Sequence, residues 1–206
     1  MSHPAIHLQA AGVLLAIASF LMAGAIIAHG PIDPDLDQQI QHIAQTAAQW
    51  IIVHWISAAG LSLFAITGLI VLSAHSRLTN VWWTITAWSV LTVGALWTMT
   101  TAVVEATVVA DAALARNTAV YAPWSAFAEG KANGFMFVTL AVAVIAGHEI
   151  QTAPKTLPDW SSWIAVSAGI LAFVGWPLGM WFGVAIGSIL WVIGSVIASL
   201  WTLWLE

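Results

Sequence analysis

Long apolar runs separated by short polar segments dominate the chain. Each run is about twenty residues long, enough to cross ~30 Å of hydrocarbon as an α-helix. The runs lack the apolar/polar alternation of barrel strands, and in lipid only helices and closed barrels satisfy the backbone. The sequence therefore predicts an all-α, polytopic membrane helix bundle of about six transmembrane helices. The predicted spans cover residues 8–29, 50–74, 81–110, 124–148, 160–176 and 179–204, within a single domain of residues 1–206.

Two of these boundaries depend on more than hydropathy. The first run resembles a signal peptide but lacks a positively charged segment before it, so we interpret it as a retained span. The last two spans must be separate, because one helix from Trp160 to Trp204 would be ~65 Å long, about twice the membrane thickness. We expect Trp176-Pro177-Leu178 to turn the chain between them.

A short amphipathic helix is predicted between the first two spans. Asp33 is a suitable N-cap and Pro34 suits the first helical position. Apolar residues then recur at helical spacing, with glutamines on the other faces. We expect this helix to lie on the outer membrane surface, over the segment Asp33–Gln49, and to lead into the second span.

Composition restricts the class of protein further. Hydrophobic residues make up 61% of the chain and charged residues 6%, whereas an ordinary soluble domain has about 25% charged residues. Membrane lipid is therefore the expected partner. The net charge of −5, with only 4 basic residues, excludes a nucleic-acid surface. The absence of cysteine excludes disulfides and thiolate metal sites.

The few basic residues predict the orientation. Six spans place Arg77, Lys155 and both termini on one side, and Arg116 on the other. The positive-inside rule then puts the N- and C-termini in the cytoplasm and the Asp33–Gln49 segment outside, in a cytoplasmic or inner membrane. Most tryptophans lie near the predicted span ends, as expected for an interfacial aromatic belt.

Polar residues within the spans gather in the outer leaflet. Ionisable residues in a membrane are costly, which makes them candidates for function. His54 and Glu105 lie on the small or polar faces of the second and third spans, so we expect both to face the bundle interior. The candidate ligand-binding residues are Glu105, His54, Glu129, Lys131, Asn133, Thr98 and Thr101, with His29 at the rim.

Several chemistries fit this set. Histidine nitrogen with carboxylate oxygen suits a divalent transition metal, with His54, Glu105 and His29 as ligands. Two histidines at equal depth could ligate a haem iron in a redox protein, and a His–Glu pair could relay protons. The structural alternatives are that Glu105 pairs with Lys131 or His54 only to brace the helices, and that the histidines lie hydrated among headgroups.

Glycines at every fourth position form a second feature of the last span. Gly179, Gly183 and Gly187 would make a smooth ridge that admits another helix closely. We interpret this glycine ridge as helix packing, within the bundle or in a homo-oligomer or larger membrane complex. The alternative is a flat ligand that lies along it.

The functional hypothesis is a polar His/Glu pocket at the outer face that binds a small ligand or a metal centre, haem included. One alternative is a non-catalytic subunit or scaffold of a larger membrane complex. Another is a proton-coupled transporter that uses Glu105. The sequence contains no nucleophile elbow and no phosphate-binding loop, so it assigns no reaction.

Overall fold

The computed structural model describes residues 3–128, 134–152, 159–175, 178, 186–187 and 189–190. These residues form helices joined by short turns, with no strand among them, which agrees with the predicted all-α class. The helices are α1 (His3–His29), α2 (Leu36–Gln45), α3 (Ala47–Ser73), the 3₁₀ helix η1 (Arg77–Thr79), α4 (Trp82–Val104), the π-helix η2 (Glu105–Val109), α5 (Ala110–Leu114), α6 (Thr118–Ala128), α7 (Gly134–Thr152) and α8 (Asp159–Gly175).

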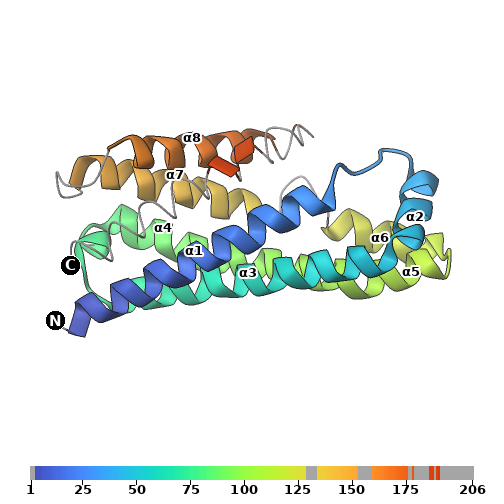
Figure 1. The fold of residues 1–206 in the computed structure, drawn as a ribbon, viewed down its shortest axis with the longest axis horizontal. Helices are drawn as coiled ribbons and strands as arrows, with labels where there is room; N and C mark the ends of the chain where they lie inside the picture. The colour runs from blue at the N-terminus through green and yellow to red at the C-terminus, as the bar shows by residue number, and fades with distance from the viewer. Residues whose placement is uncertain are drawn as a thin grey trace.

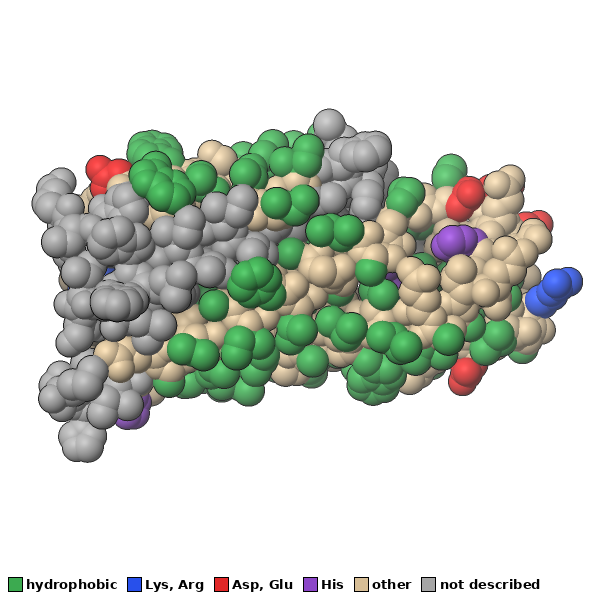
Figure 2. Space-filling view, in the orientation of Figure 1, with side chains coloured by type: hydrophobic (Ala, Val, Ile, Leu, Met, Phe, Trp, Pro, Cys, Tyr) green, Lys and Arg blue, Asp and Glu red, His purple; other side chains and the backbone are tan. Residues whose placement is uncertain are grey.

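Four helical stretches are long and apolar enough to cross a membrane, which is typical of an integral membrane protein. They are His7–His29, Ala47–Ser73, Trp82–Leu114 and Gly134–Thr152. Large apolar side chains are exposed along these helices, and acidic and basic side chains lie toward the two ends of the molecule (Figure 2). Such a surface suits lipid rather than water. Of the other two predicted spans, the fifth corresponds to the shorter apolar helix α8, and almost all of the sixth lies outside the described residues.

The long helices pack in chain order (Figure 1). α1 packs against α3, α3 against α4, α4 against α7, and α7 against α8. Within the described residues, no Cα atom of α1 comes within 8 Å of α7 or α8. At one end of the bundle α2, α5 and α6 form a small cap with its own apolar core, which includes Ile43, Val109 and Tyr121.

Glycine permits the closest helix crossing. A β-carbon at Gly94 of α4 would lie 2.9 Å from the carbonyl oxygen of Gly134 in α7, and one at Gly134 would collide with the carbonyl oxygen of Gly94. The two backbones therefore touch directly, as small residues allow in membranes. Of the predicted glycine ridge, Gly179 and Gly183 lie outside the described residues. A β-carbon at Gly187 would lie 3.0 Å from the Ala168 carbonyl oxygen, so this glycine does lie close to α8.

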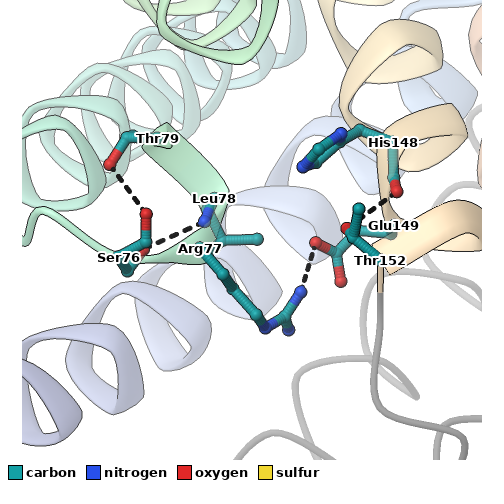
Figure 3. Close-up of polar contacts among 7 residues, drawn as sticks. All are labelled: Ser76, Arg77, Leu78, Thr79, His148, Glu149 and Thr152. Atoms are coloured by element: carbon teal, nitrogen blue, oxygen red, sulfur yellow. Dashed lines mark hydrogen bonds and ion pairs between the residues drawn. The ribbon is translucent and has the colours of Figure 1, made fainter. Parts of the chain in front are cut away.

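The opposite end of the bundle is fixed by an ion pair (Figure 3). Arg77, in the turn after α3, donates to the carboxylate of Glu149 near the end of α7 at 2.8 Å. Ser76 caps the 3₁₀ turn by accepting from the backbone N–H of Leu78. The pair connects the α3–α4 turn to α7.

Three helix boundaries predicted from the sequence differ from those in the structure. Asp35, not Asp33, caps α2: its carboxylate accepts from the N–H groups of Asp37 and Gln38, while Asp33 accepts from the N–H of Asp35. The third span continues past residue 110 to Leu114, through η2. The predicted fourth span, 124–148, is divided between α6 and α7, because residues 124–128 belong to the cap.

Candidate functional site

A small cavity lies between the cap and the membrane-spanning helices, at the depth where polar residues were expected. We call this cavity of about 90 Å³ the chamber. Residues from α1, α3, α4, η2, α6 and α7 line it. Its polar lining residues are His29, His54, Ser57, Thr98, Thr101 and Glu105.

The chamber brings together five of the eight candidate site residues. His54 and Glu105 are 6% and 5% exposed, so both are buried inside the bundle rather than in contact with lipid. Thr98 and Thr101 are buried beside them, and His29 is partly buried at the end of α1. Glu129, Lys131 and Asn133 lie outside the described residues. That the five residues bind a ligand stays a prediction.

Glu105 begins a π-helical turn. η2 spans Glu105–Val109 and interrupts an otherwise α-helical span. π-Helical turns are rare, occur mostly as single turns within α-helices, and are frequent at functional sites. This turn could not be predicted from the sequence, because neither proline nor glycine marks it.

Both chamber histidines have a defined tautomer. Nδ1 of His54 lies 2.8 Å from the carbonyl oxygen of Trp50, and Nδ1 of His29 lies 2.8 Å from that of Gly30. A carbonyl oxygen can only accept, so Nδ1 carries the hydrogen in each ring. In a neutral imidazole the lone pair is then on Nε2. In each ring Nε2 is therefore the acceptor nitrogen.

The hydroxyl groups that line the chamber also donate their hydrogens to backbone carbonyl oxygens. Ser57 donates to the Val53 carbonyl oxygen at 2.9 Å. Thr98 donates to that of Gly94 and Thr101 to that of Thr98, both at 2.7 Å. What these side chains offer a ligand is oxygen lone pairs. With the carboxyl oxygens of Glu105, these groups make the polar lining of the chamber rich in acceptors.

Three aromatic rings pack at the junction of α1 and α3. The ring of Trp50 lies 4.6 Å from those of both His29 and His54, and the two imidazoles lie 5.0 Å apart, edge to face. The imidazoles touch directly, so no porphyrin fits between them as it would between two axial haem ligands. The chamber is also far smaller than the roughly 300–1,000 Å³ of a usual ligand pocket.

A second, larger cavity lies on the cap side of the chamber. We call this cavity of about 590 Å³ the vestibule. His29 and Ile32 line both cavities and so stand between them. Its other polar lining residues are Asp33, Gln39, His42, Thr46, Gln49 and Trp50.

Apart from His29, the vestibule residues were not among the candidate site residues, because the sequence pattern placed glutamines only on the polar faces of an amphipathic helix. Gln39 is in fact 4% exposed, and its side-chain oxygen accepts from the Asp33 backbone N–H at 2.8 Å. The indole N–H of Trp50 is buried and has no acceptor among the described residues. A buried donor without a partner is uncommon in native structures.

The described residues contain no group of three or more histidine, aspartate or glutamate side chains placed to hold a metal ion. Comparison of the chain with known protein families, curated proteins and solved structures finds no significant match. Function must therefore be inferred from the chamber itself.

Proposed function

We propose that this integral membrane protein binds a small primary-ammonium ligand in the chamber. The observation that carries the proposal is the acceptor-rich lining: the polar hydrogens of two histidines and three hydroxyl groups are all donated to backbone carbonyls. Buried lone pairs gain most from a ligand that supplies donors. A primary ammonium supplies three N–H groups.

Charge favours an ammonium over a neutral donor. Glu105 lines the chamber from the start of η2, and its carboxylate, when ionised, would attract a cation as well as accept its N–H groups. Hydrogen bonds with an ionised donor or acceptor are roughly twice as strong as those between neutral groups. A cation with N–H groups would meet Glu105 and the histidine nitrogens at once.

The vestibule provides a path for such a ligand from water. It lies beside the loop between α1 and α2. Side chains of Asp33, Gln49 and the exposed His42 line it. Acidic and amide groups at its wall suit the passage of a small hydrated cation. His29 and Ile32, which line both cavities, lie between it and the chamber.

A transition-metal ion is the second candidate, and the histidine geometry favours it. Metal-binding histidines usually donate their other ring N–H to a carbonyl or carboxylate, as both do here. Two histidines bound to one tetrahedral ion at ~2.0–2.1 Å would have ring centroids roughly 5 Å apart. The observed separation is 5.0 Å.

Calorimetric titration of the protein in lipid nanodiscs tests the proposal. Methylammonium should bind the wild type, and binding should weaken about tenfold or more, ~1.4 kcal/mol, in Glu105→Gln and His54→Phe. Tetramethylammonium has the charge but no N–H group and should not bind. His148→Gln, a buried histidine at the opposite end of the bundle, is the matched control.

The same titration separates the two candidates. If Co²⁺ binds with tetrahedral visible absorption that disappears in His29→Phe and His54→Phe, while methylammonium does not bind, the metal is the ligand. Equal methylammonium binding by wild type and Glu105→Gln would refute the ammonium proposal.

A further inference from the structure

The vestibule has two structured walls. One is the loop between α1 and α2, and the other is a single face of α2 and α3 (Figure 1). Gly30 ends α1 in the left-handed conformation that favours glycine, with φ of +71°, and Pro31 and Pro34 restrict the backbone that follows. On the helical wall the lining residues recur at spacings of three or four, the spacing of one helix face. They are Gln39, His42, Thr46, Gln49, Trp50 and Val53.

Two backbone partners decide how the side-chain amides of Gln39 and Gln49 are oriented. The Asp33 N–H can only donate, so the Gln39 atom that it meets at 2.8 Å is the amide oxygen. The Ala28 carbonyl oxygen can only accept, so the Gln49 atom that it meets at 3.2 Å is the amide nitrogen. The two bonds also fasten the loop and the end of α1 to the helical wall, which holds the cavity in shape.

The other atom of each amide is left for a ligand. Among the described residues, no hydrogen bond uses the side-chain nitrogen of Gln39 or the side-chain oxygen of Gln49. Gln39 is 4% exposed and lines the vestibule, so its NH₂ group is a nearly buried donor. The Thr46 hydroxyl donates to the His42 carbonyl oxygen and keeps its lone pairs. The helical wall therefore offers both donors and acceptors.

A bound ion would suit these groups less well than a neutral ligand. The vestibule lining contains no lysine or arginine to balance an anion, and the Asp33 carboxylate would repel one. A bound cation with only N–H donors would leave the NH₂ group of Gln39 unpaired, which is costly for a buried group. A hydroxyl group both donates and accepts. A ligand with several hydroxyl groups would therefore pair with both glutamines.

We infer that the vestibule is a binding site for a neutral polyhydroxyl compound of the class of simple sugars. Its volume of about 590 Å³ lies within the roughly 300–1,000 Å³ of usual ligand pockets. Apolar lining residues such as Ile32 and Val53 suit the C–H faces of a sugar ring. His42 and Gln49 are exposed, so the cavity opens to water. The site is separate from the chamber, and the inference does not depend on an ammonium ligand there.

The first test uses glucose as the probe, with saturation-transfer NMR of the protein in nanodiscs prepared without sugar-based detergent. Glucose should bind the wild type, and tetrahydropyran, which has the same ring but no hydroxyl group, should not. Gln39→Glu keeps an oxygen to accept from Asp33 but loses the NH₂ group, so glucose binding should weaken about tenfold. Gln41→Glu adds the same charge at an exposed position of α2 outside the vestibule and should bind like the wild type.

Cysteine labelling tests the site without a change to either glutamine of the wall. Residues 41 and 42 are neighbours on α2 and both are exposed, but only His42 lines the vestibule. Glucose should slow the reaction of His42→Cys with a maleimide and leave that of Gln41→Cys unchanged. A free sugar and the headgroup of a glycolipid share this chemistry. Stronger protection by glucosyl diacylglycerol in the nanodisc than by free glucose would identify the lipid as the source, and the reverse order would identify the free sugar.

Four results would overturn the inference. Glucose could fail to protect His42→Cys, or Gln39→Glu and Gln41→Glu could bind it equally well. Tetrahydropyran binding as tight as that of glucose would show that hydrogen bonds do not select the ligand. Protection of His42→Cys by acetamide or methylammonium, but not by glucose, would assign the vestibule to an amide or to a cation instead.

Discussion

The imidazole rings of His29 and His54 meet edge to face, with their centroids 5.0 Å apart. One ring ends α1 and the other lies in the second turn of α3, so the contact ties two neighbouring spans together. Each ring donates Nδ1–H to a backbone carbonyl. These bonds fix Nε2 as the acceptor nitrogen of both rings.

Trp50, which packs on both rings, gives a prediction about stability. Its indole N–H is buried without an acceptor among the described residues, a situation that costs about 1–3 kcal/mol. Trp50→Phe should therefore leave the free energy of unfolding unchanged or raise it. Trp50→Ala should lower it by about 3–5 kcal/mol because it leaves a cavity. Denaturation in mild detergent measures both, and an equal loss in the two variants would mean that the N–H group is paired.

The crossing of α4 and α7 gives a second prediction. In Gly134→Ala the added methyl would collide with the carbonyl oxygen of Gly94, and the two helices would be forced apart. We expect a loss of about 2 kcal/mol or more, as for other overpacked sites. Gly147→Ala in the same helix meets no atom within 4 Å and should be neutral, or stabilising by up to about 1 kcal/mol. Thermal unfolding of the two variants makes the comparison, which fails if they melt alike.

These two features show what the sequence could predict of the packing. The length of the apolar runs was enough to place four spans, because crossing lipid constrains composition directly. The crossing at Gly94 was not predictable, because its partner is 40 positions away, at Gly134, and belongs to no spacing motif. Regular spacing drew attention to the Gly179–Gly187 ridge instead.

The two cavities, too, could be predicted from the sequence only in part. His54 and Glu105 could be placed together from their depths and helix faces alone, because an α-helix fixes both. The vestibule could not be predicted, since it exists only where the loop after α1 folds beside α2 and buries Gln39. The acceptor-rich lining depends on which carbonyl each side chain reaches, and helical periodicity does not contain that information.

The Arg77–Glu149 pair should contribute little to stability. The two side chains are 29% and 18% exposed, and partly hydrated ion pairs contribute about 0–1 kcal/mol. A double-mutant cycle with Arg77→Ala and Glu149→Ala should give a coupling energy of that size in detergent. A coupling energy of several kcal/mol would show that the pair is much less hydrated than these exposures indicate.

The orientation of the bundle is a prediction that cysteine labelling can decide. The chain has no cysteine, so each introduced thiol is unique. Gln41 on α2 and Ser76 in the turn before η1 lie at opposite ends of the molecule. From the basic-residue bias, Gln41→Cys in intact cells should react with an impermeant maleimide, and Ser76→Cys only after permeabilisation. The reverse pattern would place the cap and the vestibule in the cytoplasm.

The same cysteine-free background tests whether the vestibule leads to the chamber. An ammonium-bearing thiol reagent, aminoethyl methanethiosulfonate, should label Gln49→Cys in the vestibule quickly and Ser57→Cys in the chamber more slowly, because the reagent must pass His29 and Ile32. Thr67→Cys, at a position that is 1% exposed and lines neither cavity, should remain unlabelled in the folded protein.

Replacing Ile32 with tryptophan should narrow the passage and slow labelling at Ser57→Cys alone. Methylammonium should protect Ser57→Cys but not Gln49→Cys, since only the chamber offers an acceptor-rich lining. Equal labelling rates at all three positions would mean that the reagent reaches them through unfolding, and the path from vestibule to chamber would be rejected.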